Sequence, residues 1–202
     1  DGSYRTTLGR SGGGPGEISQ GSGIARGPDG TLWVNDHGNN LIIGFSEEGR
    51  EVGRYPLMVG GYSFYWTGAI DSTGVFWEQW SHSVGPRQFD ITATGPVEGQ
   101  GRLYYKSFDP GTEVYDSVEI GLVETAGYRV AHERGQLSTA IPFRSRPVST
   151  IDQSGTIWTT PSDVYQITKI DSSGDTLMVI RMADQPLPVT EEDLADWREG
   201  VS

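Results

Sequence analysis

Three short stretches of the chain repeat one pattern: a turn glycine, an apolar strand, and a tryptophan at the third position after the glycine. They are Gly30-Thr31-Leu32-Trp33, Gly74-Val75-Phe76-Trp77 and Gly155-Thr156-Ile157-Trp158. A second turn signal follows each stretch, between two strand-like runs, as the turn of a β-hairpin would. These turns lie at residues 46–49, 109–111 and 171–174. The chain therefore contains an internal repeat built from short strands.

The spacing within the repeat predicts its architecture. The two glycines of a copy lie 19 residues apart in the first and last copies and 37 apart in the middle one. Units of this size with four antiparallel strands are typical of β-propeller blades, which need neighbours to bury both faces. We therefore expect an all-β fold, a β-propeller of four-stranded antiparallel blades, with an incomplete ring in this chain. The three repeated tryptophans should fill the space between blades.

The blade boundaries follow from the strand-like runs. We expect blades at residues 23–57, 62–123 and 140–182. The middle blade has predicted strands near 63–70, 74–80, 102–108 and 112–120, with an insertion at 81–101 between its second and third strands. Residues 124–139 show no clear period and are predicted to be a linker.

Both ends of the chain carry a separate expectation. Asp1-Gly2 resembles a hairpin turn, so residues 1–9 are predicted to form the last strand of a preceding blade. Residues 190–198 begin like a capped helix, which should be short and peripheral, with Trp197 against a blade or a partner. Three blades and one strand are fewer than the four to eight that close a ring. We therefore expect the chain to belong to a longer polypeptide.

Composition limits the function. The 29 Gly and 11 Pro favour many turns, and the absence of Cys excludes disulfides, zinc-thiolate sites and a Cys nucleophile. A net charge of −12 disfavours nucleic-acid binding. No apolar run is long enough to span a membrane. We expect a periplasmic or extracellular location.

One segment resembles a known family. Leu8-Gly9-Arg10-Ser11-Gly12-Gly13-Gly14-Pro15-Gly16-Glu17-Ile18, the run from Ile24 to Asp36, and Asn40-Leu41-Ile42-Ile43-Gly44-Phe45 are similar to the NHL-type six-bladed β-propeller. The resemblance covers residues 8–55, weakens over 56–150 and returns over 148–182. It implies that Asp36 and Asn40 are structural residues whose side chains tie down a tight loop. Related propellers include metal-dependent lactonases and amidating lyases, with metal ligands at the central channel.

The sequence contains no recognisable catalytic constellation. A nucleophile elbow, a His-Glu-x-x-His motif and a calcium loop are all absent. The cluster Gly12–Gly16 has no following Lys-Ser/Thr and opens no helix, so it is interpreted as a crossing between blades. The histidines at 37, 82 and 132 lie at unrelated positions of the repeat. Asp29, Asp71 and Asp152 are interpreted as turn-stabilising residues. We expect no catalytic residue, no metal ligand and no cofactor.

Two classes of function remain. The favoured one is a non-enzymatic protein-interaction or assembly module that docks to a larger envelope-associated complex through propeller loops. Its predicted binding residues are Trp80, His82, Arg87 and Phe89, in or beside the insertion, because aromatic and Arg side chains are enriched at interfaces. The insertion could also extend the neighbouring strands into a ribbon, with 87–92 as strand, and the two interpretations are compatible. The alternative function is a metal-dependent hydrolase, lactonase or lyase with a site at the channel. A small-molecule ligand stays open.

Overall fold

The structure of the chain is a computed structural model, which describes residues 3–4, 6–56, 69–84, 94–133, 135–145, 147–183 and 187–201. Antiparallel strands form three sheets. The first sheet contains β3 (Gly21–Arg26), β4 (Leu32–Asp36), β5 (Leu41–Phe45) and β6 (Glu51–Tyr55). The second contains β7 (Ala69–Ile70), β8 (Phe76–Val84), β9 (Gly95–Asp109), β10 (Val114–His132) and β11 (Gly135–Ala140). The third contains β12 (Val148–Ile151), β13 (Ile157–Thr160), β14 (Gln166–Ile170) and β15 (Thr176–Arg181).

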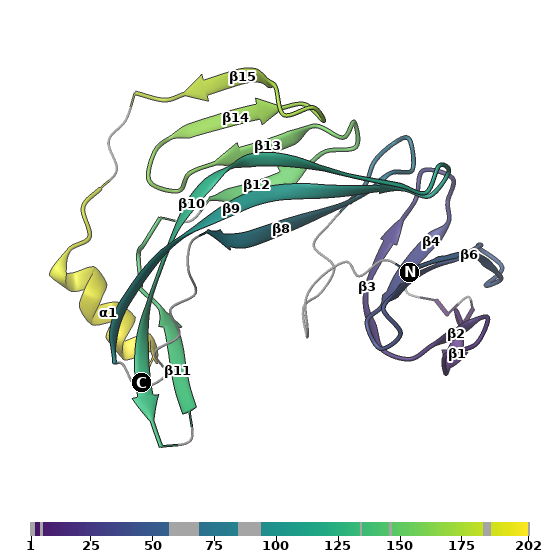
Figure 1. Cartoon of the computed structure of the whole chain (residues 1–202), viewed down its shortest axis with the longest axis horizontal. Helices are drawn as coiled ribbons and strands as arrows, with labels where there is room; N and C mark the ends of the chain where they lie inside the picture. Colours follow the sequence, from purple (N-terminus) through teal and green to yellow (C-terminus); the bar gives the residue numbers. More distant parts are fainter. Residues whose placement is uncertain are drawn as a thin grey trace.

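The fold is all-β and β-propeller-like. In each sheet the strands pair in sequence order, so every connection within a sheet joins neighbouring antiparallel strands. The first and third sheets have four strands each. The sequence predicts strands near 23–27, 31–35, 40–46 and 50–56 in the first and near 146–151, 156–160, 164–170 and 175–182 in the third, and the observed strands begin and end within two residues of these ranges. Figure 1 shows the three sheets following one another along an arc, with the first and third at opposite ends.

One turn recurs in five hairpins and explains the repeated glycines. In each, the N–H of the first turn residue donates to the carbonyl four residues later, and the glycine N–H donates back to the first carbonyl. The glycine at this position has a positive φ of between 74° and 93°, which other residues adopt only with strain. These glycines are Gly30, Gly49, Gly74, Gly155 and Gly174.

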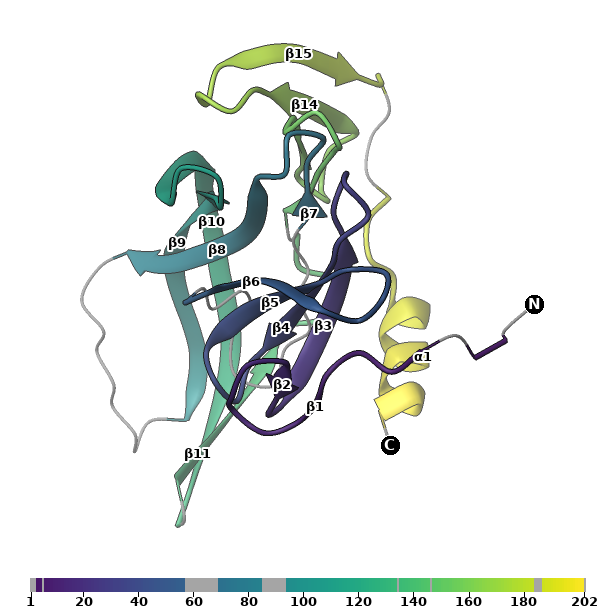
Figure 2. The same ribbon diagram turned by 90° about the vertical axis from the view of Figure 1, so that its right-hand side faces the viewer.

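The core lies between the sheets. Trp33 and Ile42 of the first sheet pack on Phe76 and Phe108 of the second, and the Trp33 and Phe76 rings meet edge to face with centroids 4.8 Å apart. Trp77 of the second sheet packs with Ile157 of the third. Two of the three repeated tryptophans therefore fill space between sheets, as predicted. Figure 2 shows β14 and β15 at the outer end of this stack.

The second sheet differs from its predicted form. β10 continues to His132, and β11 follows, so most of the predicted linker at 124–139 is strand. Ala140, predicted to open the third blade, pairs with Gly127 at the end of β11. The sequence shows no alternation of apolar and polar residues here because many side chains on both faces of this ribbon are exposed. A strand that buries neither face needs no apolar period. Figure 1 shows β9 and β10 as a long curved ribbon that ends beside β11.

The ends of the chain also differ in part. The strand predicted over residues 1–9 is absent from 3–4 and 6–9, the positions that the structure describes there. Leu8 instead packs against the buried apolar residues Val34, Ile43 and Phe45 of the first sheet, so side-chain burial rather than strand pairing holds this segment. It leads into the short parallel pair β1 (Arg10–Ser11) and β2 (Glu17–Ile18).

At the other end, α1 spans Glu191–Val201 and is the only helix among the described residues. Thr190 caps it, because the Thr190 hydroxyl accepts the Asp193 N–H and the Asp193 carboxylate accepts the Thr190 N–H. The Trp197 side chain is 41% exposed. No helix in the described part of the chain has the length and apolar character to cross a membrane.

Candidate functional site

A partly exposed face of the ribbon formed by β8, β9 and β10 gathers aromatic and charged side chains. Residues directly opposite one another in antiparallel strands lie on the same face. Trp80 is opposite Tyr104, and His82 is opposite Arg102. Glu119 of β10 lies opposite Tyr104 on its other side. Glu78 is opposite Lys106. We call this face the ribbon face; its members are Glu78, Trp80, His82, Arg102, Tyr104, Lys106 and Glu119.

A cation lies over the central aromatic ring of the ribbon face. The Lys106 ammonium is 3.9 Å from the centroid of the Trp80 ring, which is a cation–π contact. Arg102 forms a 2.9 Å ion pair with Glu119, and both side chains are about half exposed. Exposed pairs of this kind add little stability, so a partner can compete for the Arg102 guanidinium at small cost.

Two of the four predicted binding residues are on this face. Trp80 and His82 lie two residues apart on β8 and so point to the same side of the sheet. Arg87 and Phe89 lie outside the described residues. The binding role of these side chains stays a prediction.

The described part of the insertion is ribbon. β8 and β9 remain paired as far as Val84 opposite Gln100, and Gly95–Gln100 also pair with β10. Residues 87–92, predicted as strand under the ribbon interpretation, fall outside the described part. Deleting 83–99 would therefore remove part of a three-stranded sheet, and point substitutions on the ribbon face are the cleaner test.

The loop after β4 is held by a buried carboxylate, as the resemblance implied, but with one change of residue. Asp36 is fully buried and accepts hydrogen bonds from the Ser19 and Gln20 N–H groups. The side chain that completes the loop is Asn39, whose amide donates to Asp36 at 2.7 Å. Asn40 contributes a left-handed backbone with φ 55° instead. Burial raises the pKa of Asp36, but these hydrogen bonds outweigh it and hold the pKa below its ordinary value.

The glycine cluster binds carboxylates of this chain. The Gly14 N–H donates to Glu17 at 2.8 Å, and the Gly16 N–H donates to Glu51. Arg54 pairs with Glu51 at 2.9 Å and also donates to the Gly14 carbonyl. The cluster thus connects β1 to β2 and is fixed onto β6, rather than crossing between two blades.

The turn aspartates cap their turns. Asp71 accepts the Thr73 N–H and hydroxyl and the Val75 N–H, and the Trp77 indole N–H donates to it at 2.8 Å. Asp152 repeats this pattern with Ser154, Thr156 and Trp158. Asp29 is the third residue of its turn, whereas Asp71 and Asp152 are the first residues of theirs. The hydrogen bonds that its side chain accepts come from the Thr31 N–H and hydroxyl. The structure therefore confirms that these residues stabilise turns, and in two cases the carboxylate also orients the repeated tryptophan.

Asp152 supports a prediction on acid stability. Partial burial raises the pKa of this carboxyl, but hydrogen bonds from the Ser154 hydroxyl, the Trp158 indole and two backbone N–H groups lower it from 3.8 to about 2. Because the folded pKa is the lower one, the stabilisation is present above pH 4 and is lost as the pH falls towards 2. Between pH 4.5 and pH 2 we expect the Asp152→Asn chain to lose about 2 kcal/mol less unfolding free energy than the wild-type chain. Urea denaturation at pH 4.5 and at pH 2 measures this. An unchanged pH dependence in the variant would contradict the assignment.

Metal ligation finds no support among the described side chains. They include no group of three His, Asp or Glu residues close enough to hold an ion. His37 follows β4, His82 lies on β8 and His132 ends β10.

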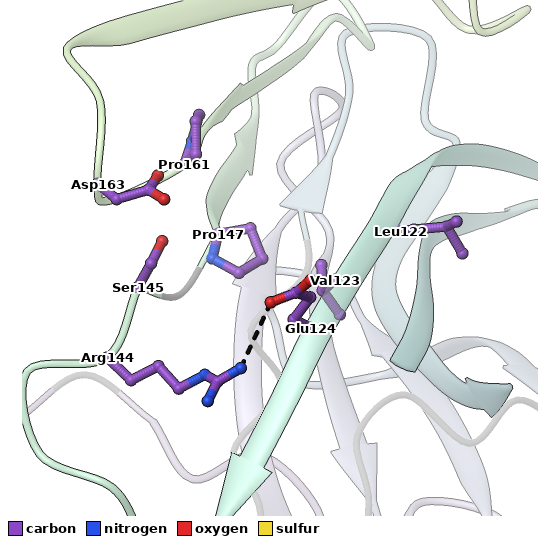
Figure 3. A pocket seen from close by; sticks show the side chains of 8 residues that line it. All are labelled: Leu122, Val123, Glu124, Arg144, Ser145, Pro147, Pro161 and Asp163. Carbon is purple, nitrogen blue, oxygen red and sulfur yellow. Dashed lines mark hydrogen bonds and ion pairs between the residues drawn. The ribbon is translucent and has the colours of Figure 1, made fainter. Parts of the chain in front are cut away.

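A cleft opens between β10 and the segment that precedes β12. Its volume is about 210 Å³, and it is lined in part by Pro147, Pro161 and Asp163. Figure 3 shows the Arg144 guanidinium reaching across this cleft to Glu124 on β10. The contact is 3.4 Å long, and Glu98 is 4.0 Å from the same guanidinium. The side chains in this cleft contribute an ion pair between β10 and the segment that precedes β12, without a nucleophile and base in contact.

Sequence reasoning missed most of the ribbon face. Arg102, Tyr104 and Lys106 alternate along β9, so a period of two places them on one side of the strand. That alternation was visible in the sequence. Their position opposite Trp80 was not, because it depends on the pairing register across the insertion.

Comparisons with known proteins give a fold-level likeness only. No protein-family model matches the chain, and no curated protein matches it significantly in sequence. Among solved structures, virginiamycin B lyase from Staphylococcus aureus is similar at 18% identity, over 82% of this chain and 71% of that chain, with a TM-score of 0.27. A streptogramin B lyase is similar at 15% identity, over 83% and 70%, with a TM-score of 0.25. Similarity at this level says nothing about what this chain binds or catalyses.

Proposed function

We propose that this chain is a non-enzymatic protein-interaction module of a six-bladed, NHL-type propeller, and that it docks through the ribbon face to a larger envelope-associated complex in the periplasm or outside the cell. The observation that supports it best is the contact of the exposed Lys106 with the partly exposed Trp80 ring, beside Tyr104 and Arg102. Aromatic and Arg side chains are the residues most enriched at the energetic centres of interfaces.

The charge of the ribbon face indicates the chemistry of the partner. The chain as a whole has a net charge of −12. The ribbon face carries Lys106 and Arg102 and also two carboxylates, Glu119 and the buried Glu78 that lies directly opposite Lys106. The charges of this face therefore balance, in contrast with the acidic molecule as a whole, so the face does not repel an acidic partner. We therefore propose a protein surface of mixed charge, with apolar groups that can stack on Trp80.

Site-specific cross-linking in cells tests this proposal. A photoreactive residue at His82 should cross-link a distinct protein, because His82 is exposed and next to Trp80 on the ribbon face. Adding Trp80→Ala should remove that product, since the contact that carries most of the energy is lost.

The matched control places the photoreactive residue at Val52 on β6, which is 55% exposed and far from the ribbon face in sequence. We expect it to give no such product. The same product from both positions, or one that persists with Trp80→Ala, would contradict docking through this face.

A further inference from the structure

One edge of β10 is paired over only part of its length. β9 pairs along the other edge, whereas β11 pairs with β10 only from Gly127 onwards. The chain then leaves β10 in a turn that contains Pro142, which has no N–H with which to continue the pairing. Before Gly127, no strand among the described residues lies along this edge. We call residues 121–126 on this side the free edge of β10.

The free edge lacks most features that keep exposed strand edges from pairing. Proteins protect such edges with lysine, proline, charged side chains or bulges, because the unpaired N–H and C=O groups bind other strands. Residues 121–126 contain no lysine or proline, and their one charged side chain is Glu124. The bulge in β10 lies between Glu119 and Gly121, and the register is regular after it. The free edge can therefore accept a further strand.

Two adjoining cavities lie beside the free edge. One is the cleft of about 210 Å³ described above, and the other has a volume of about 290 Å³. Leu122, Val123, Pro147 and Pro161 line both. Figure 3 shows Arg144 and Pro147 on the segment that faces Glu124 across the first cavity. The free edge thus borders open space, and both walls of this space come from described parts of the chain.

The larger cavity lies between the second and third sheets and has an apolar floor. Leu103 of β9 and Ile170 of β14 line it, and each is 6% exposed. Thr159 and Thr168, a cross-strand pair of the third sheet, form part of its wall. A strand added to β10 would direct every second side chain to this side of the sheet. Apolar side chains at alternate positions therefore fit the cavity.

The smaller cleft is acidic. The charged side chains that line it, or the cavity adjoining it at Glu124 and Arg144, are Glu98, Glu124, Asp163 and Arg144. Arg144 contacts Glu124 at 3.4 Å and Glu98 at 4.0 Å, and these two glutamate side chains are 77% and 81% exposed. Contacts of this kind are weak and can rearrange. Three carboxylates against one guanidinium favour a basic side chain at this end of the free edge.

We propose that the free edge of β10 binds an extended segment of a partner protein by β-strand addition. The bound segment takes the place along β10 that β11 holds further on, and its backbone pairs with the free N–H and C=O groups. It carries apolar residues at alternate positions, which enter the larger cavity, and a basic residue near Glu124. The site shares no residue with the ribbon face, so it does not depend on docking through that face.

Selection from a displayed library of random octapeptides tests the proposal on the whole chain. We expect the enriched peptides to share apolar residues at alternate positions and a basic residue towards one end. Two N-methylated forms of an enriched peptide then test the pairing, one methylated on the even residues and one on the odd. Only one set of N–H groups faces β10, so one form should bind at least about tenfold more weakly than the other. Equal affinities of the two forms, or no enriched peptide, would overturn the proposal.

Thr159→Phe tests the cavity, because the larger ring occupies the space that the apolar side chains of the peptide enter. We expect the dissociation constant of the enriched peptide to rise at least about tenfold. Thr150→Phe is the matched control, since Thr150 is exposed and lies opposite Trp158, on the other face of the third sheet. It should leave the affinity unchanged. Equal effects of the two variants would exclude the cavity as the binding place.

Hydrogen exchange on the wild-type chain gives a readout that needs no variant. In an antiparallel strand, every second residue directs its N–H and C=O groups away from a given neighbour. Binding of the unmethylated peptide should slow exchange at least about tenfold for the amides of residues 121–126 that point away from β9. Amides of β6 in the first sheet should exchange at unchanged rates. A bound peptide that leaves the exchange of residues 121–126 unchanged would show that it binds elsewhere and would contradict strand addition.

Discussion

We expect Asp71→Ala to lower the free energy of unfolding by about 3 kcal/mol. Asp71 is 6% exposed and accepts four hydrogen bonds, including the one from the Trp77 indole. Alanine accepts none of them, so the Trp77 N–H is left without its acceptor between two sheets. Urea denaturation followed by circular dichroism measures the change.

The matched control is Asp171→Ala. Asp171 caps the same kind of turn and accepts hydrogen bonds from Ser173 and Asp175, but it is more exposed and has no tryptophan donor. We expect a clearly smaller loss of unfolding free energy than for Asp71→Ala. Equal losses in the two variants would mean that the carboxylate–tryptophan contact adds nothing.

The second large effect is expected for Trp33→Ala, at about 4 kcal/mol of unfolding free energy. Trp33 is 9% exposed and packs on Phe76, and its ring lies over two glycines. A Cβ at Gly44 would come within 2.8 Å of the Trp33 ring, so the ring fills its space closely. Alanine would leave a cavity between the first and second sheets that the rigid strands cannot close.

Trp197→Ala serves as the control, because the Trp197 side chain is 41% exposed on α1. We expect its unfolding free energy to change by less than about 1 kcal/mol. If Trp33→Ala were as mild as Trp197→Ala, the packing between the first two sheets would not depend on the repeated tryptophan.

The sequence predicted the first and third sheets closely because both obey local rules. Gly30 and Gly155 sit in turns that need a positive φ, and Trp33 and Trp158 follow at the same spacing. Such signals lie within a few residues of the structure they specify. The same turn chemistry made the roles of Asp71 and Asp152 predictable.

The second sheet was less predictable because its form depends on pairing between distant residues. β9 and β10 extend well past the blade, and many of their side chains on both faces are exposed, so no apolar period marked the continuation to His132. The ribbon face was therefore found only in part. Trp80 and His82 stood out as unusual residues near an insertion, whereas Lys106 needed the register that places it beside Trp80.

The claim that the ribbon face is the functional surface is tested most directly by a binding isotherm. The protein identified by cross-linking at position 82 would be purified and titrated with the wild-type chain, with Trp80→Ala and with Val52→Ala. We expect the dissociation constant to rise at least about tenfold for Trp80→Ala, which removes the ring under Lys106, and to stay unchanged for Val52→Ala. Equal affinity of all three chains would contradict the account.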